Sequence, residues 1–151
     1  QKQFSRIMSF KDGMKKMSKS DPSDLSRINL TDSKDEISNK VKKAKTDPMT
    51  MPSNIKDLTE RPETKNLLGI YSSLKSQNLD SSIKEFQGKQ FSEFKEKLSE
   101  ILIEKIEPIS IKIKKLLNDE KYLDEILLKG AEKADKIASK KIKEIKELVG
   151  F

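Results

Sequence analysis

The sequence predicts a mainly α-helical protein, in which a helical bundle follows one short strand and a loop. Three observations lead to this expectation. Apolar residues recur at spacings of three and four through most of the second half of the chain. A Ser-x-x-Glu pattern at residues 33–36 is typical of a helix start. Only one run before it, residues 4–10, is compatible with a strand.

The strand and loop occupy residues 1–32. Phe4, Ile7, Met8 and Phe10 supply the apolar side chains of the predicted strand. Because a single strand is not stable alone, we expect its sheet partners in sequence outside this chain. The chain opens with Gln1 in the middle of this pattern, which we interpret as a portion of a longer protein. Residues 11–32 are predicted to be a loop, since glycine, proline, serine and aspartate recur there.

A basic helix is predicted to begin at Ser33, with Asp32 as an alternative cap, and to end near Lys45. One face of this helix is apolar, and the other faces carry lysines. The apolar face holds Ile37, Val41 and Ala44, and the lysines are Lys34, Lys40, Lys42, Lys43 and Lys45. Residues 46–62 then contain three prolines and no clear period, which is typical of a functional loop or a linker. We place the main domain boundary there.

Residues 63–151 are predicted to form an all-helical bundle. Helical spacing of apolar residues runs over 63–75, over a shorter stretch at 81–86, and over the two long stretches 90–117 and 120–149. Pro108 lacks the N–H that a helix interior needs, so we expect a kink there. The predicted organisation therefore has three segments: 1–32, 33–62 and 63–151.

Composition limits the chemistry. The chain contains no cysteine and no histidine, which excludes thiolate chemistry and removes the commonest metal ligand. The net charge is +7, and residues 1–50 hold 12 Lys/Arg against 7 Asp/Glu. This local excess favours a phosphate-bearing partner, ATP or nucleic acid, although a lysine-rich proteome explains the overall excess equally well. No apolar run approaches the length of roughly 20 residues that spans a bilayer, so we expect a cytoplasmic protein without membrane contact.

The most informative stretch is Lys16-Met17-Ser18-Lys19-Ser20, followed by Asp21-Pro22. Two ammonium groups beside hydroxyl and backbone donors suit a polyphosphate, whose negative charge moves during phosphoryl or adenylyl transfer. Runs of lysine and serine are also common in solvated loops. Composition alone therefore leaves both interpretations open.

The literal string resembles the KMSKS signature of class I aminoacyl-tRNA synthetases. With its flanks, Arg6-Ile7-Met8-Ser9 and Thr46-Asp47, it resembles the tryptophanyl-tRNA synthetase family. Weaker similarity at residues 66–71, 87–89 and 130–134 extends the resemblance over nearly the whole chain. It implies that residues 1–32 are the last strand and the KMSKS loop of a Rossmann-type catalytic domain. It also implies that residues 63–151 are the helical anticodon-binding domain.

The resemblance also implies roles for single residues. Lys16 and Lys19 would be catalytic, neutralising the phosphates of ATP as pyrophosphate leaves. Ser18 and Ser20 would supply hydroxyl contacts to ATP, and Ile7 and Met17 would lie near its adenine. The reaction implied is activation of tryptophan by ATP with Mg²⁺, and then transfer to tRNA(Trp). No tightly bound cofactor and no metal site of the chain's own are expected.

The family's HIGH-type tetrad and its tryptophan pocket are not in this chain, which has no histidine. We therefore expect the C-terminal portion of a homodimeric ligase, inactive by itself and without affinity for DNA. The alternative is a stand-alone helical module that binds tRNA or another RNA without catalysis. A third interpretation is a helical bundle that carries the signature by chance.

Overall fold

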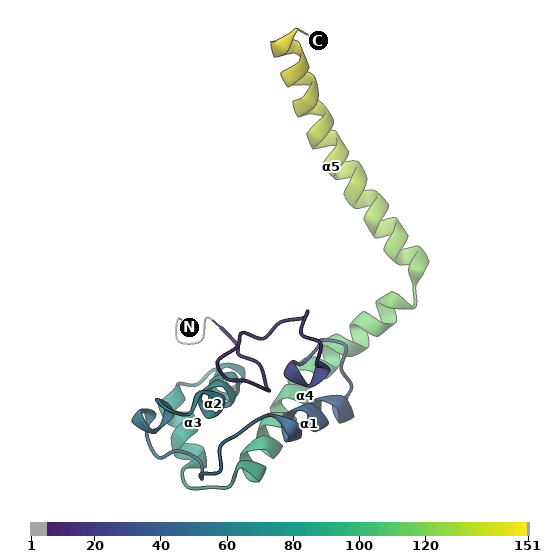
Figure 1. The fold of residues 1–151 in the computed structure, drawn as a ribbon. Helices are drawn as coiled ribbons and strands as arrows, with labels where there is room; N and C mark the ends of the chain where they lie inside the picture. Colours follow the sequence, from purple (N-terminus) through teal and green to yellow (C-terminus); the bar gives the residue numbers. More distant parts are fainter. Residues whose placement is uncertain (1–5, 151) are drawn as a thin grey trace. The chain divides into compact units, whose positions relative to one another are not determined.

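The computed structural model describes residues 6–150, and this part of the chain is mainly helical (Figure 1). Five α-helices are found there, with two short 3₁₀ turns at Asp24–Ser26 and Ile55–Leu58. The helices are α1 (Lys34–Lys43), α2 (Pro62–Leu74), α3 (Leu79–Phe86), α4 (Phe91–Leu117) and α5 (Glu120–Val149). The predicted mainly α fold class is confirmed, and each predicted helix has its counterpart.

The strand predicted over residues 4–10 is not seen in the described part of this segment, and Phe4 lies outside the described residues. Met8 instead forms an isolated antiparallel bridge with Lys16. No strand is present anywhere in residues 6–150. The physical reason is that a strand needs a paired backbone along its length, and among the described residues only the Met8–Lys16 bridge is formed.

The chain forms two compact units, the first running to Ile111 and the second beginning at Lys112. The first unit holds the hydrophobic core, which draws side chains from the segment before α1, from α1, from the proline-containing loop, and from α2, α3 and α4. One residue from each of these parts, in chain order, is Phe10, Ile37, Met51, Leu68, Ile83 and Leu98. The division into segments at residues 32 and 62 concerns function and stays a prediction.

Helix α1 begins as its sequence predicts. The Ser33 hydroxyl accepts a hydrogen bond from the Glu36 N–H at 3.3 Å, and the Glu36 carboxylate accepts one from the Ser33 N–H at 2.8 Å. This reciprocal pair is a capping box, so Ser33 rather than Asp32 is the cap. Ile37 and Val41 are buried as expected, but Lys40, predicted on a polar face, is buried with them at 3% exposure.

Three aromatic rings join α2, α3 and α4 within the first unit. Tyr71, Phe86 and Phe94 make edge-to-face contacts with centroid separations of 4.9–5.9 Å. Helices α2 and α3 lie side by side (Figure 1). Helix α4 continues through Pro108 without a break. The segment that precedes α1 packs against the same core through Phe10.

The second unit consists of the end of α4 and the 30-residue helix α5. Asp119 caps α5 by accepting a hydrogen bond from the Tyr122 N–H at 3.1 Å, and Gly150 ends it with a φ of +84°. No residue of α5 is buried. Among residues 6–150, no helix combines the length and the apolar character needed to cross a bilayer.

Candidate functional site

We call residues Lys16–Ser20 the signature loop. The first half of the site is the turn that leads into this loop. Residues 7–10 and 15–17 run antiparallel, with the Ser9 N–H donating to the Lys15 carbonyl at 2.8 Å. The Met17 N–H donates to the Ile7 carbonyl at 3.0 Å. The backbone of the signature loop is therefore tied at its N-terminal end to the segment that precedes it.

The side chain of Asn66, on α2, fixes this turn by two hydrogen bonds to Met8. Its side-chain oxygen accepts from the Met8 N–H at 2.9 Å, and its amide nitrogen donates to the Met8 carbonyl at 2.8 Å. Asn66 is only 7% exposed. A buried amide that satisfies both polar groups of one residue fixes that residue in position, because losing either bond would leave a buried polar group unpaired.

Gly13 lets the same turn approach the start of α2 closely. A Cβ atom at this position would lie 2.5 Å from the Glu63 nitrogen and 2.6 Å from the Pro62 carbonyl carbon. No other residue fits there without moving the backbone. The Glu63 carboxylate pairs with the Lys45 ammonium group at 2.8 Å, and this hydrogen bond lowers the pKa of Glu63. The N-terminal end of the site is therefore packed tightly against α2.

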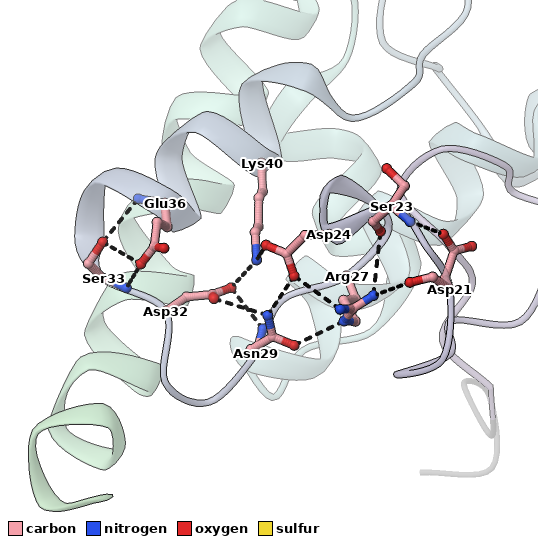
Figure 2. A network of polar contacts seen from close by, with 9 residues as sticks. All are labelled: Asp21, Ser23, Asp24, Arg27, Asn29, Asp32, Ser33, Glu36 and Lys40. Atoms are coloured by element: carbon pink, nitrogen blue, oxygen red, sulfur yellow. Dashed lines mark hydrogen bonds and ion pairs between the residues drawn. The ribbon is translucent and has the colours of Figure 1, made fainter. Parts of the chain in front are cut away.

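The C-terminal end of the signature loop is held by Arg27 (Figure 2). Its guanidinium donates to the carbonyl of Asp21 at 2.9 Å and to that of Ser23 at 3.4 Å. The same group pairs with the Asp24 carboxylate at 3.1 Å and donates to the Asn29 side chain at 3.1 Å. Arg27 thus binds the backbone directly after the signature loop, and two side chains fix its orientation.

Lys40 connects this network to α1, as Figure 2 shows. Its ammonium group lies 2.6 Å from the Asp24 carboxylate and 2.7 Å from that of Asp32. Burial opposes the charge of Lys40, but the hydrogen bonds to the two carboxylates outweigh it and raise its pKa. The hydrogen bonds from Lys40 and from Asn29 lower the pKa of Asp24. Both shifts favour the charged forms, so the network is stable as a set of ions.

The predicted site residues stand between these two anchors. Lys16, Ser18, Lys19 and Ser20 are exposed. Within residues 6–150, the ammonium groups of Lys16 and Lys19 have no hydrogen bond or ion pair. Ser18 accepts from the Ser20 N–H at 3.2 Å, which shapes the turn.

The two residues assigned to the adenine side are brought together by their backbone bond but differ in surroundings. Ile7 is 48% exposed, whereas Met17 is partly buried and packs against the hydrophobic core. Ile7 therefore offers an apolar surface to a ligand. Met17 offers less, because part of its side chain already packs against the core.

This arrangement can bind a polyanion. Two cations that have no partner among the described residues lie on a backbone that is fixed at both ends. Such preorganised charge can stabilise negative charge that moves during a reaction. Within residues 6–150 there is no group of acidic side chains able to hold a metal ion.

The anchoring residues Arg27, Lys40 and Asn66 were not identified as site residues from the sequence. Met8 and Asn66 are 58 positions apart, so no local pattern connects them. A weak signal existed for Lys40. It is the lysine of α1 that follows Ile37 by three positions, on the edge of the buried face.

A comparison with known protein families shows the class of this chain. A family model described as tRNA synthetases class I (W and Y) matches residues 2–107. The chain therefore belongs to the class I tRNA synthetases of the tryptophan and tyrosine group. This confirms the class I resemblance that the signature and its flanks indicated.

Among individual proteins, the similarity is to tryptophan–tRNA ligases. The chain is 49% identical to that of Agrobacterium fabrum over 146 residues, which cover 97% of this chain and 41% of the relative. It is 53% identical to that of Rickettsia felis, covering 97% and 44%. The crystal structure of tryptophanyl-tRNA synthetase from Mycoplasma pneumoniae matches with a TM-score of 0.59 at 27% identity, over 73% of this chain and 35% of that one. The chain spans about two fifths of the length of these curated relatives.

Proposed function

We propose that this chain is the C-terminal part of a tryptophan–tRNA ligase, called the intact enzyme below. The ligase activates tryptophan with ATP to an adenylate, releases pyrophosphate, and transfers the tryptophanyl group to the 3′ end of tRNA(Trp). The support is the identity of about half of all residues over 97% of the chain. In the intact enzyme, residues 4–10 would extend the sheet of a Rossmann-type catalytic domain.

Lys16 and Lys19 would carry the chemistry of the signature loop. The observation that supports this role most strongly is that neither ammonium group has a partner in the described part of the chain, while the loop ends are anchored. Their charge is therefore available to neutralise the pyrophosphate as the bond to the α-phosphate breaks. Ser18 and Ser20 would donate hydroxyl hydrogen bonds to ATP, and Ile7, with the exposed part of Met17, would contact its adenine.

Mg²⁺ would enter as part of the substrate, bound to the phosphates of ATP. Magnesium prefers octahedral oxygen coordination and keeps several waters, so it is commonly held by substrate phosphates with few protein ligands. The residues that we assign to ATP include no carboxylate, so the phosphates would be the anionic ligands of the ion. These side chains fit ATP–Mg²⁺, and the lysines and hydroxyls among them would bind the phosphates.

The helices from residue 63 onward would bind the anticodon of tRNA(Trp). Lysines are distributed along α5, and no residue of that helix is buried, so its surface is open to a ligand. Phosphate contacts from lysine give affinity, whereas single-stranded bases give specificity. We further propose that the intact enzyme is a cytoplasmic homodimer.

Tryptophan-dependent exchange of pyrophosphate into ATP tests the ligase assignment. The intact enzyme should catalyse this exchange. The isolated chain should not, because the tryptophan pocket and the HIGH-type tetrad lie outside it. Exchange by the purified chain would contradict the assignment of this part, and no exchange by the intact enzyme would contradict the activity itself.

The second candidate is a stand-alone tRNA-binding module. The observation that favours it is that the first unit closes a hydrophobic core of its own, from Phe10 to Leu102. A binding measurement distinguishes the two candidate functions. The affinity of the isolated chain is measured at fixed salt for tRNA(Trp) and for tRNAs of altered anticodon. Affinity and anticodon preference equal to those of the intact enzyme would favour the module. Weaker binding with a modest preference would favour the portion of a ligase.

A further inference from the structure

We propose that Arg27 is a positioning residue for the signature loop: it holds the backbone after Ser20 and thereby fixes where the Lys19 ammonium group stands. This inference rests on the proposed function, because it takes the chemistry of Lys19 as given. Arg27 touches neither ATP nor pyrophosphate in this account. It acts through the carbonyl groups of Asp21 and Ser23.

The contacts of Arg27 point in two directions. On one side its guanidinium donates to the carbonyls of Asp21 and Ser23, at 2.9 and 3.4 Å. On the other side it meets the Asp24 carboxylate and the Asn29 amide oxygen, both at 3.1 Å. The Arg27 side chain is 18% exposed. A planar guanidinium that is bonded on two sides has little freedom to move. It therefore restrains the backbone carbonyls that it binds.

The partners of Arg27 are themselves fixed. Asp24 and Asp32 share the buried Lys40 ammonium group, and the Asn29 amide nitrogen donates to both carboxylates, at 2.9 and 3.2 Å. A continuous set of charged hydrogen bonds therefore runs from α1 to the carbonyl of Asp21 (Figure 2). Lys19 stands two residues before that carbonyl.

The geometry matters because a point charge stabilises a transition state only when it stands in the right place. A misplacement of about 1 Å at a reacting centre costs on the order of 100-fold in rate. Releasing the backbone at Asp21 would let the exposed turn of Lys19 and Ser20 move. Lys19 would then contribute less to the reaction, although its own side chain is unchanged.

A double-mutant cycle in the intact enzyme tests this coupling. Pyrophosphate exchange is measured for Lys19→Ala, for Arg27→Gln and for the pair, with kcat and the KM for tryptophan recorded separately. We expect each single change to lower kcat with little change in the KM for tryptophan. We also expect Lys19→Ala to cost about tenfold less in the Arg27→Gln background than in the unchanged enzyme. Arg27→Lys should show intermediate coupling, since it keeps the charge but cannot bond both sides.

Arg61 offers a matched control. Its guanidinium also binds a carboxylate, Asp47 at 2.7 Å, and a backbone carbonyl, Thr50 at 2.9 Å, and it too is largely buried. It holds a different loop, so Arg61→Gln should lower stability while its effect on exchange is additive with that of Lys19→Ala. Equal coupling at Arg27 and Arg61 would mean that any lost packing in the first unit has this effect, and would overturn the specific assignment.

The outcomes also separate this inference from the proposed function. If Lys19→Ala leaves exchange normal, the proposed role of the loop fails, and the inference fails with it. If Lys19→Ala lowers exchange and the Arg27→Gln effect is strictly additive with it, the proposed function stands and the positioning role of Arg27 is wrong. A coupled loss confined to Arg27 supports both.

Discussion

Two pairs of cations lie close together in the sequence and have opposite surroundings. Lys16 and Lys19 are exposed and have no partner among residues 6–150, whereas Arg27 and Lys40 are largely enclosed and bonded to carboxylates. The difference shows that a positive side chain can serve either the fold or a ligand. The charge of Lys40 is already neutralised by Asp24 and Asp32, whereas the charges of Lys16 and Lys19 remain available to the polyphosphate that we propose as their ligand.

The largest expected effect concerns stability and Lys40. Lys40→Met keeps the volume of the side chain but leaves Asp32, which is 5% exposed, without its ammonium partner. Breaking a buried ion pair in this way should lower the free energy of unfolding by about 3–5 kcal/mol. Urea unfolding of the chain, followed by circular dichroism, measures the change. Lys43→Met on the exposed side of α1 is the control and should stay within about 0.5 kcal/mol.

The next effect concerns Asn66, the uncharged side chain that fixes the N-terminal end of the signature loop. Asn66→Ala removes both hydrogen bonds to Met8 and leaves its backbone groups unpaired. We expect a loss of about 1–3 kcal/mol in unfolding free energy. Unlike the loss caused by breaking the Arg27–Asp24 ion pair, this loss should not depend on salt concentration. A strong dependence on salt would show that the two anchors are not of different kinds.

The smallest effect is the dependence of stability on pH. The pKa of Asp24 is lowered from 3.8, so the stability that it contributes is present above pH 3.8 and is lost as the pH falls below that value. The pKa of Lys40 is raised from 10.5, so its contribution is present below pH 10.5 and is lost as the pH rises beyond it. Thermal unfolding over this range should therefore show a plateau with losses at both ends. Lys40→Met should reduce the loss at the alkaline end, because the contribution of Lys40 is then absent. Part of that loss should remain, because burial raises the pKa of Tyr71, which ionises more readily in the unfolded chain.

Much of the fold could be predicted from local patterns. The capping box at Ser33 and the apolar spacing of residues 120–149 predicted the start of α1 and the bounds of α5, because both signals depend on residues within one or two turns. The signature loop was also predicted from its sequence, since its residues are consecutive, and its role in the reaction stays a proposal.

The anchors of the site could not be predicted in this way. Asn66 binds Met8 across 58 residues, and Lys40 reaches Asp24 and Asp32 from the next helix. A lysine in a lysine-rich helix looks solvated until its partners are placed in space. The strand expected at residues 4–10 depends in the same way on neighbours, and the described residues supply only the Met8–Lys16 bridge.

The measurement that tests the central claim most directly is tryptophan-dependent pyrophosphate exchange by the intact enzyme carrying Lys16→Ala or Lys19→Ala. Lys15→Ala is the matched control, because Lys15 is a neighbouring exposed lysine that already pairs with Asp12 at 3.8 Å. We predict that each signature variant loses about 100-fold in kcat, with unfolding free energy unchanged, and that the control keeps its activity. Normal exchange by both signature variants, or an equal loss in the Lys15→Ala control, would contradict the claim that the unpaired charges of Lys16 and Lys19 serve the reaction.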